Sequence, residues 1–419
     1  MNEKSTNNGR VIGLDSHPDT FTAALISGHT PAAAIVEKVF NKLPMERLAH
    51  WALKHTHPED LIVLEASGNS FEVVRSLEAI GRQARVLESC HLGKLKEAHA
   101  NNDKISAVRI GKAYLAGTAK IVWVPDPATQ ERRDWYHAHR KVVSGTIQMN
   151  NRLLSYLSDN GVRLGRKLPA PEEREKLLSQ AKEWSPRQWQ VIEGMLMGLR
   201  HAEEQREHWR SLMAQEVLGD PLLLSLVRLY GVRDVIAFAL GALIGDIHRF
   251  ANPRKLVGYV GLNPAFDDSG QESWQGGIGG HGRKDLRSLL IEAAQCILRS
   301  KHPLAKWGKR LAARKGSMKL AVAAVARKLT IAIWYLMKGQ WTQLEEVDDL
   351  LHRKVGKIIT QVGKKGLKQI GKSSKELREQ TVESLKTGRV YVLDSNKKFT
   401  SKPTAQPTSI AIAQEYGLR

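Results

Sequence analysis

Three carboxylates stand where this chain could hold a metal ion. Asp15 and Glu65 each end a run of apolar and β-branched residues, which is typical of a buried strand in a mixed sheet. A carboxylate at a strand end emerges at the sheet edge, where α/β sheets usually place ligands. Asp103 completes the set, and carboxylate oxygens are the ligands that Mg²⁺ prefers. The three acids predict a Mg²⁺ site that handles nucleic-acid phosphates; the alternative is three separate surface acids at strand ends.

A second feature that could take part in a reaction is Ser269, which precedes a glycine-rich stretch, 276–284. Glycines expose backbone N–H groups and let a phosphate approach closely. The stretch runs into a predicted helix, 285–300, whose N-terminal dipole favours anions. It therefore joins a hydroxyl nucleophile to an anion site. The alternative is a flexible connector with an incidental serine.

The positive charge is concentrated in the last third of the chain. The net charge is +21; residues 299–338 contain 11 Lys and Arg without an acid, and residues 351–419 contain 15 against 5 acids. Such a concentration suits a polyanion, because each neutralised phosphate releases counterions. A solvated basic face without a partner is the alternative. The cations that we expect to contact nucleic acid are Arg283, Lys284, Arg287, Lys306, Lys309, Arg310, Arg314, Lys315, Lys319 and Arg327.

Length and composition exclude several classes of protein. The chain has 419 residues, 42% of them hydrophobic, which is enough for two or three domains with a sizeable core. No apolar run approaches the roughly 20 residues of a membrane span, and the N-terminus lacks the layout of a secretory signal. Two cysteines, Cys90 and Cys296, suggest neither a disulfide framework nor a zinc cluster. We therefore expect a cytoplasmic protein.

The first 125 residues alternate strand and helix signals. We expect strands at 11–15, 21–26, 34–40, 61–65, 84–87 and 121–124, and helices at 44–55, 70–80 and 91–117. Three hairpin strands followed by β–α–β is the strand order of an RNase H-like fold. The first and fourth strands of that fold carry acids side by side, which fits Asp15 and Glu65.

The rest of the chain reads as mainly helical. Residues 129–157 and 171–218 predict two long helices, which pair either within the chain or between two chains. Residues 222–264 predict helices joined by a glycine turn. Two basic helices follow, and beyond them we expect a Lys-rich arm that binds phosphates and has a disordered end.

An ordered set of motifs spans residues 11–337. The motifs are Gly13-Leu14-Asp15-Ser16-His17, Leu64-Glu65-Ala66-Ser67-Gly68, Asn102-Asp103-Lys104-Ile105-Ser106-Ala107-Val108-Arg109-Ile110, Trp123-Val124-Pro125-Asp126, Gly245-Asp246-Ile247-His248-Arg249-Phe250, Tyr259-Val260-Gly261-Leu262-Asn263-Pro264, and Ser269-Gly270 with the glycine-rich loop and Leu286-Arg287. No single motif is decisive, but their order is specific. In this order the chain resembles the DEDD-type insertion-sequence transposases of the IS one-ten family, which act as bridge-RNA-guided DNA recombinases.

The resemblance implies an α/β plus α fold in three segments. These are a RuvC-like (RNase H-like) domain over 1–127, a helical coiled-coil and dimerisation segment over 128–219, and a mainly helical transposase domain over 220–340. A basic C-terminal extension, 341–419, lies outside the resemblance.

The resemblance also implies which residues bind the metal. Asp15, Glu65 and Asp103 match three of the family's four acids. The fourth acid lies three residues after the third, where this chain has Ser106. Ser106 could bind Mg²⁺ through its hydroxyl or a water, or Asp126 could substitute for the missing acid, or the site could be incomplete.

By the same resemblance, Ser269 matches the nucleophile. It would attack a DNA phosphodiester and leave a covalent ester for religation, so the two catalytic halves must meet within one chain or across a dimer. The expected partners are donor and target DNA, a bridge RNA that supplies sequence choice, and further copies of the chain in a dimer or tetramer. Two alternatives stay open: a RuvC-like nuclease or junction resolvase that uses water, and a non-catalytic nucleic-acid-binding protein.

Overall fold

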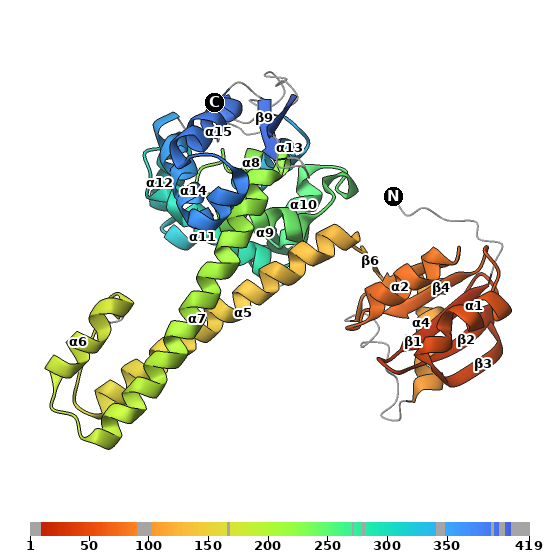
Figure 1. Cartoon of the computed structure of the whole chain (residues 1–419). Coiled ribbons are helices and arrows are strands. Elements are labelled where there is room, and N and C mark those ends of the chain that lie inside the picture. The colour runs from red at the N-terminus through yellow and green to blue at the C-terminus, as the bar shows by residue number, and fades with distance from the viewer. Residues whose placement is uncertain are drawn as a thin grey trace. The chain divides into compact units, whose positions relative to one another are not determined.

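A computed structural model of the chain divides it into two compact units, Met1–Asp126 and Pro127–Arg419 (Figure 1). The structure describes residues 10–89, 102–165, 168–269, 272–278, 281–340, 348–386, 389–393 and 399–403. The expected boundary after residue 127 lies next to the division between the units. The expected boundaries after residues 219 and 340 lie inside the second unit.

The first unit is built on one mixed sheet of six strands. The strands are β1 (Val11–Ser16), β2 (Thr20–Ser27), β3 (Ile35–Pro44), β4 (Leu61–Glu65), β5 (Gln83–Leu87) and β6 (Ile121–Val122). Their order is β3-β2-β1-β4-β5-β6, with β1 antiparallel to β2 and parallel to β4. The predicted mixed α/β architecture of this region is confirmed, and β1 with its acid lies in the middle of the sheet.

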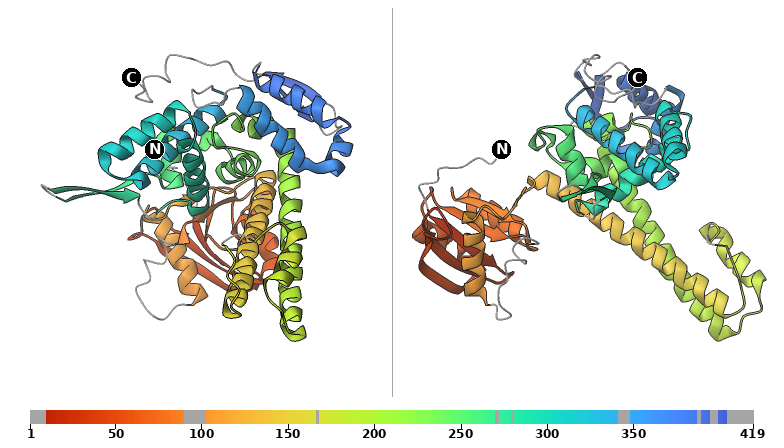
Figure 2. Two further views of the ribbon diagram at one scale, coloured as in Figure 1. Left: turned by 90° about the vertical axis from the view of Figure 1, so that its left-hand side faces the viewer. Right: turned by 180° about the vertical axis from the view of Figure 1, so that it is seen from behind.

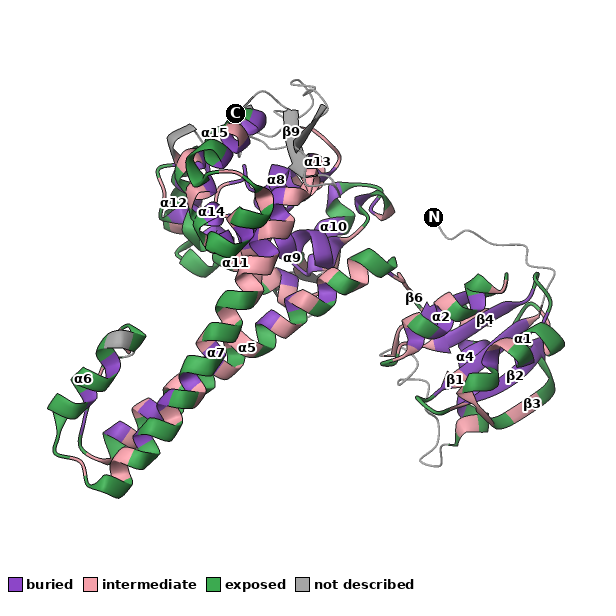
Figure 3. Cartoon of the chain, viewed as in Figure 1, coloured by how far each residue is buried: buried purple, intermediate pink, exposed green. Residues whose placement is uncertain are grey.

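Helices cover both faces of this sheet. Because side chains alternate along β1, successive residues pack against helices on opposite faces. Ile12 and Leu14 point to the face covered by α1 (Leu48–His55) and α2 (Ser70–Ala79). Val11 points to the other face, where it packs against α4 (Asp103–Leu115). Figure 3 shows the buried residues along the central strands. Residues 91–101 of the predicted helix at 91–117 lie outside the described residues.

The second unit contains a long helical hairpin. Helices α5 (Pro127–Asp159) and α7 (Pro186–Gly219) run side by side, and α6 (Pro171–Ala181) lies between them in sequence (Figure 1). The prediction of one helix over 171–218 is wrong, because α7 has its own start. The Ser185 hydroxyl accepts a hydrogen bond from the Gln188 backbone N–H, and the Ser185 backbone N–H donates the reciprocal bond to Gln188 Oε1. Pro186 occupies the first helical position. The hairpin pairs within one chain.

Shorter helices complete the second unit around a common core. They are α8 (Pro221–Leu226), α9 (Asp234–Ile244), α10 (Pro253–Val260), α11 (Lys284–Leu298), α12 (Pro303–Lys315), α13 (Met318–Met337), α14 (Asp348–Ile370) and α15 (Ser374–Lys386), with strands β9 (Arg389–Leu393) and β10 (Phe399–Pro403). Within the described residues only α13 is long and apolar enough to cross a membrane. Its apolar residues Val325, Leu329 and Ile333 lie in the core of this unit, which is the environment of a core helix.

The Lys-rich region after residue 347 is folded rather than an extended arm. Leu351, Val355 and Ile358 of α14 are buried in the same core. Their spacing of three to four residues gives α14 one apolar face, and Lys357, Lys364 and Lys365 are exposed. Residues 404–419 lie outside the described residues.

The glycine-rich stretch begins as a strand. Strands β7 (Pro264–Ser269) and β8 (Glu272–Ile278) form an antiparallel hairpin in which Ser269 pairs with Glu272. Figure 2 shows this hairpin as a two-stranded ribbon that extends from the helices of the second unit. The prediction of a loop over 276–284 is therefore wrong for residues 276–278, and Ser269 is the last residue of β7.

Candidate functional site

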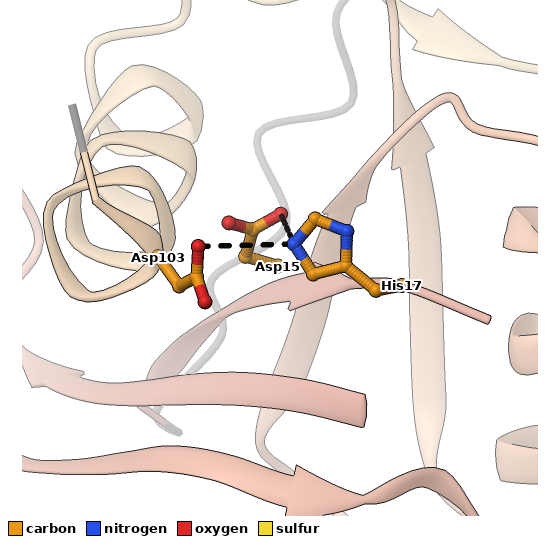
Figure 4. Close-up of side chains that lie close together, drawn as sticks. All are labelled: Asp15, His17 and Asp103. Atoms are coloured by element: carbon orange, nitrogen blue, oxygen red, sulfur yellow. Dashed lines mark ion pairs between the residues drawn. The ribbon is translucent and has the colours of Figure 1, made fainter. Parts of the chain in front are cut away.

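The structure brings Asp15 and Asp103 together, and His17 joins them. One ligand atom from each of the three side chains lies within 4.8 Å of the others. The Nε2 atom of His17 lies 3.9 Å from Asp15 Oδ1 and 3.8 Å from Asp103 Oδ1. Figure 4 shows the imidazole ring next to both carboxylates. Residues 15 and 103 thus form one acidic site on the first unit.

Close packing of α4 against β1 creates this meeting point. A Cβ atom built on Gly13 would lie 1.9 Å from the Ala107 carbonyl oxygen and 2.9 Å from the Gly111 backbone nitrogen. Only a glycine lets the helix approach the strand so closely. The helix starts at the site because the Asn102 side chain accepts a hydrogen bond from the Ile105 N–H. Asp103 is therefore the first residue of α4 and faces the end of β1.

Glu65 lies on the neighbouring strand but outside the three-residue group. Leu14 pairs with Leu64 in the parallel register, so Asp15 and Glu65 follow at equivalent positions of adjacent strands. Both positions belong to the face of the sheet that α4 covers, since Val11, Leu61 and Val63 of that face pack with α4. Glu65 is half-buried at the end of β4. Glu65 is not among the three described residues whose ligand atoms lie within 4.8 Å of one another.

Ser106 binds Asp15 directly through its hydroxyl. It lies one turn after Asp103 on α4 and is buried. Its hydroxyl donates a hydrogen bond to the Asp15 carboxylate and accepts one from Arg109 Nη2 at 3.2 Å. In the family that the chain resembles this position carries an acid, whereas here the neutral Ser106 hydroxyl connects Asp15 to the cation Arg109. Asp126, the other candidate for the fourth acid, is exposed and is not part of the group.

The surroundings of Asp15 make its negative charge unfavourable. Burial raises the pKa of Asp15, and the nearby charge of Asp103 raises it further. His17, Arg109 and the Ser106 hydroxyl act in the opposite direction, without cancelling the shift. A cation bound between Asp15 and Asp103 would remove this penalty, because it stabilises both ionised carboxylates. The donor set of two carboxylates, a hydroxyl and an imidazole therefore fits a divalent metal ion.

The substitution Ser106→Asp tests this explanation. A third carboxylate at the site adds ligand charge, so we expect the dissociation constant for Mg²⁺ to fall about tenfold. In the absence of metal the new carboxylate would be buried and would repel Asp15 and Asp103, so we expect a lower melting temperature in EDTA. Titration calorimetry and thermal unfolding measure the two effects. Ser158→Asp, at an exposed position of α5, adds the same charge elsewhere and serves as the control. Unchanged Mg²⁺ affinity in Ser106→Asp would contradict a metal site at residues 15 and 103.

Two neighbours of the acids were not predicted as site residues. His17 belongs to the first motif and follows Asp15 by two residues, so its position in the turn after β1 was the available signal. Lys42 Nζ lies 3.7 Å from Asp103 Oδ2. Lys42 has φ 50° in an irregularity of the β2–β3 pairing, where its backbone N–H donates to Thr22 Oγ1. Such a bulge redirects a side chain in a way that residue spacing does not reveal.

The base of the β7–β8 hairpin is held by arginines. Arg287 Nη1 donates to the carbonyl of His281 at 2.7 Å and to that of Gly261 at 3.3 Å. Arg283 pairs with Asp285 and donates to the Tyr259 hydroxyl. Both ends of the hairpin are therefore tied to the end of α10. The structure places Ser269 at the end of β7.

These contacts divide the predicted nucleic-acid-binding residues into two groups. Arg283 and Arg287 are half-buried and engaged in packing. The others are exposed on α12, α13 and the start of α11: Lys284, Lys306, Lys309, Arg310, Arg314, Lys315, Lys319 and Arg327. Exposed cations on adjacent helices form a surface that suits a phosphate backbone.

Comparison with known proteins identifies the class to which this chain is related. Residues 225–307, from α8 to α12, match the model of the transposase IS116/IS110/IS902 family, and this segment contains Ser269. The chain is 25% identical over 287 residues to the transposase for insertion sequence element IS1111A of Coxiella burnetii, which covers 67% of this chain and 78% of the relative. A probable family 20 transposase of Pseudomonas aeruginosa is 23% identical over 350 residues, or 78% of this chain and 97% of the relative.

A third relative has a similar extent. The transposase for insertion sequence element IS1328 of Yersinia enterocolitica is 21% identical over 334 residues, or 78% of this chain and 96% of the relative. The chain is thus related to insertion-sequence transposases. The matched model over 225–307 is that of the IS116/IS110/IS902 transposases, in line with the resemblance seen in the motifs.

Proposed function

We propose that this chain is an insertion-sequence transposase that cleaves and rejoins DNA through a covalent ester at Ser269. The acidic site of the first unit would act on the same phosphodiester. The observation that carries the proposal is the meeting of Asp15 and Asp103, 88 residues apart in sequence, in a chain whose second unit matches a transposase family. The order β3-β2-β1-β4-β5 supports an RNase H-like first domain, because the acids lie where that fold carries them.

Asp15 and Asp103 would hold a divalent metal ion, which we propose is Mg²⁺. His17 and the Ser106 hydroxyl complete the nearest donors, and Glu65 is proposed as a further ligand from the adjacent strand end. Bound there, Mg²⁺ would neutralise charge that develops on a phosphate. The residues of the chain have their own tasks: Ser106 and Arg109 orient the Asp15 carboxylate, and the close approach at Gly13 holds Asp103 beside it.

The proposed chemical step is a transesterification. The Ser269 hydroxyl oxygen attacks the phosphorus of a DNA phosphodiester and gives up its proton. The bond from phosphorus to the terminal oxygen of the departing strand breaks, and that oxygen takes up a proton. The energy of the ester is conserved in the Ser269–phosphate bond, so a hydroxyl of a second DNA strand can reverse the step and join the ends.

The substitution Ser269→Ala tests this step. With a nicked DNA substrate and Mg²⁺, we expect the wild-type chain to give a covalent protein–DNA adduct on a denaturing gel. We expect Ser269→Ala to abolish the adduct and to reduce strand exchange by at least about 10³-fold, because the attacking group is lost. Ser273→Ala, in the paired strand β8, removes a hydroxyl from the same hairpin and should leave the adduct unchanged. Cleavage by Ser269→Ala without any adduct would instead identify a nuclease that uses water.

The proposed partners are donor and target DNA and a guide RNA that chooses between them by base pairing. Exposed cations on α12 and α13 would hold the phosphate backbones in a dimer or tetramer of the chain. RNA that co-purifies with the protein should, once sequenced and added back, direct strand exchange between two DNAs that match it. Strand exchange that proceeds equally well after ribonuclease treatment would reject the guide.

A further inference from the structure

A cavity lies in the second unit, among five separate parts of the chain. It has a volume of about 1050 Å³ and is lined by residues of α5, α7, α11 and α14 and by the turn before α9. All of these residues belong to the same compact unit. The size exceeds what one phosphate ion needs and is at the upper end for pockets that hold whole organic ligands. The cavity is separate from the acidic site, because no residue of the first unit lines it.

The lining of this cavity is strongly basic. Arg206, Arg210 and Arg233 come from α7 and the turn before α9, and Arg140 comes from α5. Helix α14 adds three more cations, and two carboxylates, Asp234 and Glu292, are found among the described residues of the lining. Asp234 pairs with Arg233 Nε at 2.6 Å, and Glu207 on α7 pairs with Arg206 Nη2 at 3.3 Å and Arg210 Nη1 at 3.2 Å. The unbalanced positive charge of the lining therefore comes mainly from Arg140 and α14. An excess of cations on concave walls attracts an anion more strongly than the same charges on a flat surface.

Helix α14 fixes its cations at the cavity through a contact with the protein core. Lys354 Nζ donates hydrogen bonds to the carbonyl oxygens of Val227 and Leu229 at 2.6 and 2.8 Å. Arg353 and Lys357, one on either side, line the cavity and are exposed. Neither forms an ion pair within the part of the chain that the structure describes. Their charges are therefore available to a ligand.

His139 supplies an independent sign of a missing ligand. It lines the cavity and is only 6% exposed, yet neither ring nitrogen has a hydrogen-bond partner among the described residues. Arg206 Nε, on the facing helix, is buried without a partner in the same described part of the chain. Burial and the charges of Arg210 and Arg206 lower the pKa of His139 to about 4, so the ring is neutral and carries one N–H. Unpaired buried polar atoms are costly, and an anion that accepts from both side chains would remove that cost.

We propose that this cavity binds the sugar–phosphate backbone of a single nucleic-acid strand, with His139 and Arg206 donating to phosphate oxygens and Arg353 and Lys357 neutralising neighbouring phosphates. The choice of a nucleic acid rests on the proposed function, whereas the choice of an anion rests on the cavity alone. Tyr230, half-buried in the wall, adds an aromatic ring to the lining, and that ring packs against His302 with 4.6 Å between the ring centroids. The site is new relative to the basic surface of α12 and α13, since none of their residues lines it.

The test measures binding of a fluorescent 20-nucleotide single strand, as RNA and as DNA of the same sequence, by anisotropy in EDTA. For the full chain with Arg353→Glu and Lys357→Glu we expect affinity to fall about tenfold or more and the salt dependence to become shallower by about one phosphate contact per cation. The control pair Lys364→Glu and Lys365→Glu makes the same charge change at exposed positions of α14 outside the cavity. A larger loss for RNA than for DNA, or the reverse, identifies which strand the cavity takes.

Equal losses in the cavity pair and the control pair would overturn the proposal, as would unchanged affinity in the cavity pair. A poly-glutamate peptide that displaces the oligonucleotide as well as unlabelled strand does would also overturn it, because the cavity would then be a site for acidic protein. His139→Leu provides a second readout: we expect higher stability and lower affinity together. The experiment contains no metal and no cleavage, so its result is independent of Asp15 and Ser269.

Discussion

Asp15→Asn is expected to abolish metal-dependent DNA cleavage while making the metal-free protein more stable. Loss of a charged ligand between β1 and α4 should reduce cleavage by at least about 10³-fold, because the stabilisation that a bound metal gives to a reacting phosphate amounts to several kcal/mol. The gain in stability follows from the pKa of Asp15, which burial and Asp103 raise above the ordinary value of 3.8. The folded state therefore binds the proton more tightly than the unfolded state.

The sign of the pH dependence follows from that raised pKa. The contribution of Asp15 to stability is fully present below pH 3.8 and is lost as pH rises through the higher folded-state pKa. At pH 7 the ionised carboxylate thus destabilises the metal-free protein, and an amide does not. We expect thermal unfolding in EDTA to show a higher melting temperature for Asp15→Asn than for wild type at pH 7, with the difference shrinking as pH falls. Added Mg²⁺ should stabilise wild type and leave Asp15→Asn unchanged.

A matched control separates this effect from a general loss of negative charge. Asp19→Asn makes the same change at an exposed position of the turn between β1 and β2. It should alter neither the cleavage rate nor the response of the melting temperature to Mg²⁺. A lower melting temperature of Asp15→Asn in EDTA would show that the carboxylate serves the fold, and that the acidic site is structural.

Gly13→Ala is expected to separate α4 from β1 and so to disassemble the acidic site. The added methyl group would meet the Ala107 carbonyl at 1.9 Å and the Gly111 nitrogen at 2.9 Å, and both are backbone atoms that cannot rotate away. Forcing an extra carbon into a packed core costs about 1–3 kcal/mol. Because α4 must move, Asp103 moves away from Asp15, and we expect Mg²⁺ affinity and DNA cleavage to fall together.

Urea unfolding and titration calorimetry measure the two consequences in the same preparation. Gly68→Ala, in the loop after β4, is the control for stability, because a Cβ atom there would meet no atom within 4 Å. Its free energy of unfolding should stay within about 0.5 kcal/mol of wild type. A Gly13→Ala chain with wild-type stability and Mg²⁺ affinity would show that the close approach of α4 does not position the site.

Much of the first unit could be predicted from sequence because its strands and the placing of its acids are local properties. Alternation along β1 fixes that Asp15 and Gly13 share one face, and the run before Glu65 places that residue on the next parallel strand. Ser185 and Pro186 also mark the start of α7 in sequence, although the predicted single helix over 171–218 took no account of them. The excess of Lys and Arg in the region of α12 and α13 could also be predicted, because it is counted directly in the sequence.

Only the tertiary structure decided which groups surround Asp15. The bond from Ser106 depends on how closely α4 packs on Gly13, and the contact of Lys42 depends on a bulge. Arg283 and Arg287, which were predicted to contact nucleic acid, donate hydrogen bonds at the base of the β7–β8 hairpin, and their spacing in sequence did not indicate this. Residue type gives the charge of a side chain, but its partners follow from distances set by elements far away in sequence.

The sequence by itself determined the strands of the first unit, the acids at their ends, the basic helices and the motifs that point to transposases. The tertiary structure decided that His17 and Ser106 lie with Asp15, that α14 folds onto the core, and that cations of several elements line one cavity around His139. The physical reason is the range of the interactions. Periodicity and net charge are read along the chain, whereas burial, hydrogen bonding and pKa depend on atoms that only folding brings together.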